Sequence, residues 1–101
     1  MIEQLERLSE AGIQILPASG RGTHFILERG GLVALVERRG DAFGSVGSTG
    51  ILTPNGMAVL VWRGAEAWFV ARGYERLARP EEVTAVRDFS ASLANALKFS
   101  H

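Results

Sequence analysis

The stretch that decides the fold runs from Thr23 to Arg38 and reads THFILERGGLVALVER. Its centre, Gly30-Gly31, predicts a two-residue type I′ turn, because glycine accepts the positive φ that both central positions need. The turn fixes the register of a hairpin in which Arg29 faces Leu32. Apolar side chains then lie on both faces: Phe25, Leu27, Ala34 and Val36 on one face, and Ile26, Val33 and Leu35 on the other.

A second hairpin is predicted from Met57 to Arg72, where Gly64-Ala65 fits a type II′ turn with glycine first. This turn places Arg63 opposite Glu66 as a cross-strand ion pair. Antiparallel strands with one solvated face normally alternate between apolar and polar residues, and these strands do not. One face holds Leu60, Trp62 and Phe69, and the other holds Val59, Val61, Trp68 and Val70.

Helices are predicted at both ends of the chain. Residues 2–11 place Ile2, Leu5 and Leu8 on one side, and Gly12 follows as a C-terminal cap. Residues 80–98 begin with proline, two glutamates complement the positive end of the helix dipole, and Lys98 sits near the negative end. The apolar stripe of this helix consists of Val83, Val86, Phe89, Leu93 and Leu97.

These elements predict an α+β fold in which residues 1–101 form a single domain. An antiparallel sheet of about five strands, built from a short strand at 13–16 and the two hairpins, is flanked by the N-terminal helix and the longer C-terminal helix. The order of helix, three strands, connection, two strands and helix is similar to that of small dimeric bacterial secretion chaperones. That resemblance implies a dimeric protein that binds a protein or peptide partner.

Composition narrows the function classes. Eleven basic and eleven acidic side chains give no net charge to attract nucleic acid or an anionic membrane. The absence of cysteine and the wide separation of the two histidines disfavour a metal site, and no cofactor motif is present. The longest apolar run is too short for a membrane helix, so we expect a cytoplasmic protein. Arginine makes up ten of the eleven basic residues, which indicates a GC-rich bacterial genome.

The segment Gly40 to Gly56 is rich in glycine and lacks the lysine and the following helix of a phosphate-binding loop. We expect it to be a long crossover between the hairpins. The alternative functional hypothesis is a small-molecule binding protein or minor enzyme with a pocket between this crossover and the sheet. Its candidate ligand-binding residues are His24, Glu37, Ser48 and Thr49, although a surface cross-strand pair is the simpler interpretation of His24 and Glu37.

The apolar strands favour a partner. Two short helices on one side of the sheet would leave the other face bare, and monomers rarely expose a large apolar patch. A two-fold homodimer would bury it, with Trp62, Trp68, Phe69 and Leu60 as candidate interface residues. The alternative places one helix on each face, with the glycine-rich segment covering the remainder.

The leading functional hypothesis is therefore a non-enzymatic homodimeric binding or adaptor domain, chaperone-like toward a protein or peptide. No motif in the chain identifies that partner. A domain that senses a ligand through its dimer interface is a third hypothesis.

Overall fold

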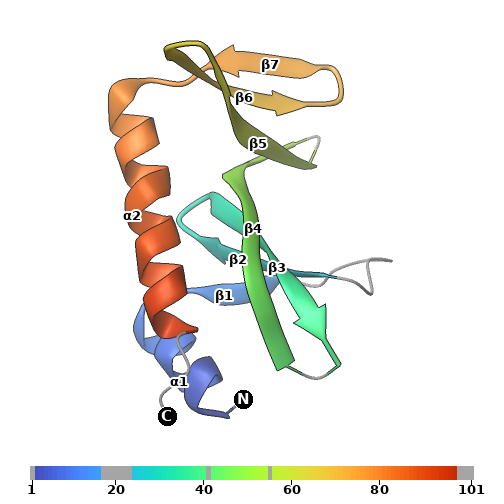
Figure 1. Cartoon of the computed structure of the whole chain (residues 1–101), viewed down its shortest axis with the longest axis vertical. Helices are drawn as coiled ribbons and strands as arrows, with labels where there is room; N and C mark the ends of the chain where they lie inside the picture. Colours follow the sequence, from blue (N-terminus) through green and yellow to red (C-terminus); the bar gives the residue numbers. More distant parts are fainter. Residues whose placement is uncertain (1, 17–23, 41, 55, 98–101) are drawn as a thin grey trace.

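The computed structural model describes residues 2–16, 24–40, 42–54 and 56–97, and this part of the chain forms one antiparallel sheet with two helices (Figure 1). The α+β class is confirmed, but the sheet has seven strands rather than about five. They follow each other in chain order, each paired with the next. The elements are α1 (Ile2–Glu10), β1 (Gln14–Leu16), β2 (His24–Arg29), β3 (Leu32–Arg39), β4 (Ala42–Thr53), β5 (Gly56–Arg63), β6 (Glu66–Ala71), β7 (Tyr74–Leu77) and α2 (Pro80–Ala96).

Both predicted hairpins are present with the predicted register. His24 faces Glu37 at one end of β2 and β3, and Arg29 faces Leu32 at the other. Gly30 and Gly31 have φ values of 59° and 88°, as a type I′ turn requires. In the second hairpin Gly64 has a φ of 67°, so local turn chemistry specifies both connections.

The prediction that Gly40 to Gly56 is a crossover loop is wrong. Most of it is β4, the longest strand, which pairs with β3 along one edge and with β5 along the other. Pairing on both edges satisfies the backbone groups of a segment whose glycines and serines have low strand propensity. The sheet also gains β7, whose turn has a φ of 72° at Gly73.

Both helices lie on the same face of the sheet, which we call the helix face. Its largest cluster joins Leu8 of α1 and Leu27 of β2 to Phe89 and Leu93 of α2. A smaller cluster joins Ala58 and Phe69 to Val86 of α2. The alternative with one helix on each face is therefore excluded, and α2 spans the height of the sheet in Figure 1.

The apolar stripe predicted for the N-terminal helix is only partly used. Leu8 is buried, but Ile2 is 74% exposed and Leu5 40% exposed. The buried polar residue is Gln4, whose Nε2 donates a hydrogen bond of 3.0 Å to the carbonyl of Leu97. The short α1 thus meets the end of α2 through a hydrogen bond as well as through apolar contact.

The predicted helix boundaries need small corrections. The predicted Gly12 cap of α1 is confirmed by a φ of 75° and by a hydrogen bond of 2.8 Å from the amide of Ile13 to the carbonyl of Leu8. The C-terminal helix ends at Ala96, and Lys98 lies outside the described residues.

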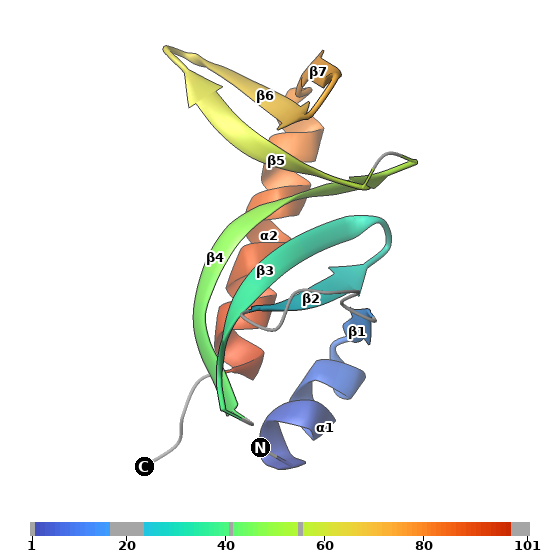
Figure 2. The ribbon, with the colours of Figure 1, turned by 90° about the vertical axis from the view of Figure 1, so that its right-hand side faces the viewer.

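The sheet bends along β4, which curves between the β2–β3 hairpin below and the β5–β6 hairpin above (Figure 2). Gly50 is buried at this bend, and a Cβ there would lie 2.9 Å from the Cα of Val59 and still closer to the carbonyl of Ala58. The close approach of β4 and β5 at this point requires glycine.

Candidate functional site

The side of the sheet turned away from the helices, which we call the open face, has an apolar centre. Successive side chains of a strand point to opposite faces of the sheet. The residues of this centre are therefore the ones that alternate along each strand with the residues packed against α2. Its members come from four strands, and all are half-buried except Val33, which is 0% exposed. They are Ile26, Val33, Leu35, Val59, Val61, Trp68 and Val70.

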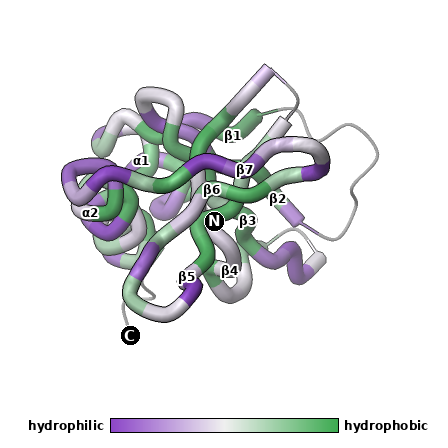
Figure 3. Tube along the Cα trace, turned by 90° about the horizontal axis from the view of Figure 1, so that it is seen from above, coloured by the Kyte–Doolittle hydropathy of each residue, from purple (hydrophilic) through white to green (hydrophobic). Residues whose placement is uncertain are grey.

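Charged residues border this apolar centre, and they are paired on the sheet surface. Arg63 Nη1 lies 2.6 Å from Glu75 Oε1, and its guanidinium lies 5.3 Å from the Trp68 ring centroid. The ion pair predicted between Arg63 and Glu66 is thus replaced by one that reaches across β6 to β7. The cause is β7, a strand that local sequence did not predict. Seen from above, hydrophobic residues run along the middle of the strands, and hydrophilic ones gather at turns and along α2 (Figure 3).

Only two of the four predicted ligand-binding residues come together. His24 and Glu37 are cross-strand partners. Arg39 lowers the pKa of Glu37 by donating a hydrogen bond of 2.6 Å to Oε1, and a weaker Coulombic effect comes from His24. Glu37 is therefore held mainly by an arginine on its own strand.

Ser48 and Thr49 do not join this pair. Thr49 faces Ala34 on the helix face, and Ser48 lies where the pairing of β3 with β4 shifts register. His24 lies two strands away from them. The glycine-rich segment that was expected to cover a pocket is itself a strand of the sheet, so the predicted constellation has no enclosure in the described structure.

The four predicted interface residues divide between the two faces. Phe69 is 0% exposed and lies with Leu60 against α2, within the core of the chain itself. Trp68 lies on the open face beside Arg63. Trp62 belongs to the helix face but stands beyond the end of the core and is 57% exposed.

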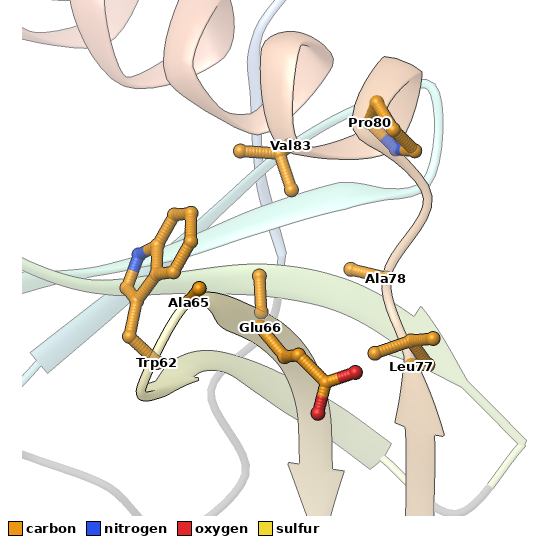
Figure 4. Close-up of a pocket in the computed structure, with 8 residues that line it drawn as sticks. Trp62, Ala65, Glu66, Leu77, Ala78, Pro80 and Val83 are labelled. Carbon is orange, nitrogen blue, oxygen red and sulfur yellow. The ribbon is translucent and has the colours of Figure 1, made fainter.

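Trp62 forms one wall of a hollow of about 450 Å³ between the β5–β6 turn, the end of β7 and the start of α2 (Figure 4). The hollow is predominantly apolar, and the single ionisable residue that lines it is Glu66. Sequence reasoning missed this site because it needs Leu77 of the unpredicted β7. The lining residues are Trp62, Ala65, Glu66, Ala67, Leu77, Ala78, Pro80 and Val83.

A charged clamp holds this end of the molecule together. The Arg76 guanidinium donates two hydrogen bonds to the Glu82 carboxylate, at 2.8 and 2.7 Å, and a third of 3.1 Å to the hydroxyl of Tyr74. The same guanidinium lies 5.1 Å from the Phe69 ring centroid. Glu82 also accepts a hydrogen bond of 2.9 Å from the amide of Arg79, so the clamp joins β7 to the start of α2.

Acid should weaken the clamp. Arg76 lowers the pKa of Glu82 to about 2 from its ordinary 4.5, chiefly through these hydrogen bonds. Between pH 2 and pH 4.5, Glu82 binds fewer protons in the folded chain than in the unfolded chain. The stabilisation by the clamp is therefore complete above pH 4.5 and is lost as the pH falls toward 2. Because the pair is partly exposed, we expect the loss to be about 1 kcal/mol. Urea denaturation between pH 4.5 and pH 2 should show this loss of stability in the native chain but not in Glu82→Gln. The control Glu81→Gln changes an exposed neighbouring residue, and it should lose stability as the native chain does.

Comparisons with protein-family models, with curated proteins and with solved structures each return no match to this chain. None of the described helices is long and apolar enough to cross a membrane. Within the described ranges, no three histidine, aspartate or glutamate residues are grouped as metal ligands. The candidate sites in the described structure are the open face and the hollow.

Proposed function

We propose that this chain is a non-enzymatic binding domain that works as a homodimer, in which the open faces of two copies meet. The observation that carries the proposal is the placement of α1 and α2 on the same face of the sheet. No helix in the described part of the chain covers the apolar centre of the open face. A second copy supplies the missing cover without a new sequence.

The open face suits contact with itself. In a two-fold interface the same patch meets its own copy, so an apolar centre is buried against an apolar centre. The border carries Glu75 paired with Arg63 and Glu37 paired with Arg39, and each pair is close to neutral. The chain has no net formal charge, so two copies do not repel each other at long range.

The non-enzymatic part of the proposal is supported by where the titratable groups lie. Among the described residues, the perturbed carboxylates Glu28, Glu37 and Glu82 serve turns and ion pairs. Glu28, for example, accepts hydrogen bonds from Gln14 Nε2 and from the amide of Gly31. None of the three lines the hollow, so the chemistry typical of an active site is not gathered there.

A pair of leucine substitutions tests the dimer. Leu52 lies on the open face and is 50% exposed, and Leu5 lies on α1 and is 40% exposed. A charge at either position should be tolerated by the fold, because both side chains already reach solvent. We expect Leu52→Glu to weaken self-association at least tenfold, and Leu5→Glu to leave it unchanged, as measured by light scattering after size-exclusion chromatography.

Val61→Glu, at the centre of the open face, should give monomers at every accessible concentration. Circular dichroism on the same samples shows whether each variant is folded. A native chain that elutes as a monomer contradicts the proposal. Equal association by the native chain and Leu52→Glu, with loss in Leu5→Glu, moves the interface to α1.

A further inference from the structure

The sheet divides into two parts where β4 meets β5. The register of β4 with β5 covers Gly50 to Thr53 of β4. Within the described residues, Ala42 to Thr49 of β4 are paired with β3 alone, and Leu60 to Arg63 of β5 are paired with β6 alone. Figure 2 shows the two strands diverging from their shared end. A short seam therefore joins β1–β4 to β5–β7.

The core of the helix face divides at the same place. Phe89 of α2 belongs to the larger cluster, which includes residues of β2, β3 and β4. Val86, three residues earlier in the helix, belongs to the smaller cluster with Ala58 and Phe69. Leu32 of β3 is half-buried and packs against both clusters. Few buried side chains thus hold β5, β6 and β7 to the rest of the molecule.

The clamp between Arg76 and Glu82 adds to these contacts. Its side chains are 36% and 26% exposed, so water can replace the ion pair when it separates. The amide of Ala78 donates a hydrogen bond of 2.8 Å to the carbonyl of Ala67, so the chain stays with β6 until just before α2 begins. At the other end of this part, Gly56 has a φ of 109°, a conformation that suits glycine. Both connections are therefore changes of chain direction.

We propose that residues 57–77, which we call the flap, open from α2 as one unit while β1–β4 stay packed against the helix. The clamp between Arg76 and Glu82 holds the flap closed. Proteins open locally in contiguous units where few buried contacts join a unit to the rest. Opening uncovers α2 around Val86 and separates the two parts of the open face.

Flap opening regulates the proposed dimer, and this step rests on the proposed function. The apolar centre of the open face takes Val59 and Val61 from the flap, and Ile26 and Leu35 from β2 and β3. A second copy that contacts both parts binds the closed flap more tightly than the open one. Self-association therefore closes the flap, and flap opening weakens self-association by the same factor.

Native-state hydrogen exchange followed by NMR at low urea concentrations tests the flap. We expect the amides of β5 and β6 to be at least about tenfold less protected than those of β2 and β3. Glu82→Gln should lower the protection of the flap by about two- to fivefold, because it removes a partly exposed ion pair. The matched control Glu81→Gln should leave it unchanged.

Val36→Ala distinguishes a separate flap from a single cooperative unit. Val36 is fully buried in the larger cluster, and its contacts persist when the flap opens. The most protected amides of β2 and β3 should therefore lose protection at least about fivefold, while the flap keeps its native protection. An equal loss in both parts would overturn the inference. Equal protection of both parts in the native chain would also overturn it.

Sedimentation of the same samples keeps the two proposals apart. If the native chain is a monomer whose flap opens separately, the dimer proposal fails and the flap stands. If the native chain is a dimer in which all amides share one free energy of opening, the flap proposal fails alone. In a native dimer, flap protection should rise with protein concentration, and in monomeric Leu52→Glu it should not. Flap protection that is the same at all concentrations of a native dimer contradicts the regulation.

Discussion

Gly50→Ala is expected to unfold the chain or to lower its stability by at least about 3 kcal/mol, because the added Cβ meets backbone atoms. The new methyl would lie inside van der Waals contact of the Ala58 carbonyl and 2.9 Å from the Cα of Val59. Backbone atoms in a paired strand cannot rotate away as a side chain can. The bend of β4 would have to open, and the β5–β6 hairpin would lose its position against α2.

The matched control is Gly44→Ala in the same strand. Its nearest neighbours are side-chain atoms of Glu37 and Arg39, which can move. We expect this change to alter stability by less than about 1 kcal/mol. Thermal and urea unfolding followed by circular dichroism measure both variants. Similar stability of Gly50→Ala and the native chain would contradict the close approach of β4 and β5.

Phe69→Ala is expected to cost about 3 to 5 kcal/mol of the free energy of unfolding, the range for a buried phenylalanine. Phe69 is fully buried with Ala58 and Val86, and Arg76 lies over its ring. Small domains have stabilities of roughly 5 to 15 kcal/mol, so this loss is a large fraction of the total. Because the contact lies within the chain, the loss of stability in Phe69→Ala should not depend on protein concentration.

Trp62→Ala provides the comparison, since Trp62 lies on the same face but is largely exposed. We expect it to cost about 1 kcal/mol or less. Denaturant unfolding at two protein concentrations separates intrachain from interchain contributions. A Phe69→Ala variant of native stability that no longer self-associates would instead place Phe69 at an interface, as the sequence alone predicts.

Turns and helix ends could be predicted from the sequence because their causes are local. Gly30-Gly31 and Gly64-Ala65 specify the register of two hairpins through backbone conformations that few other residues accept. Pro80 marks the start of α2, and Gly12 marks the end of α1. In each case the signal lies within a few residues of the feature that it produces.

The strand β4 could not be predicted in the same way, because its stability comes from partners on both sides. Its glycines and serines disfavour a strand when taken alone. The apolar residues Phe43, Val46 and Ile51 all pack toward α2, and Thr53 pairs with Gly56 where β4 meets β5. The irregular pairing of β3 with β4 breaks simple alternation and conceals this pattern.

The prediction of the candidate sites was incomplete for the same reason, because part of the sheet was not predicted. From the sequence, the exposed face could carry either the Trp62 set or the Trp68 set of side chains. Contacts with Val86 place Leu60 and Phe69 on the helix face, and Trp68 therefore belongs to the open face. The hollow depends on Leu77 at the end of β7, so it could not be assembled from two hairpins and two helices.

Isotope-filtered NMR on an equal mixture of labelled and unlabelled chain detects contacts between copies only, so it shows whether two open faces meet. We expect intermolecular nuclear Overhauser effects among the methyl groups of Val59, Val61 and Val70, together with twice the mass of one chain in solution. A single-chain mass with no intermolecular effects, or effects confined to the methyl groups of Ile2 and Leu5, would rule out a dimer formed through the open faces.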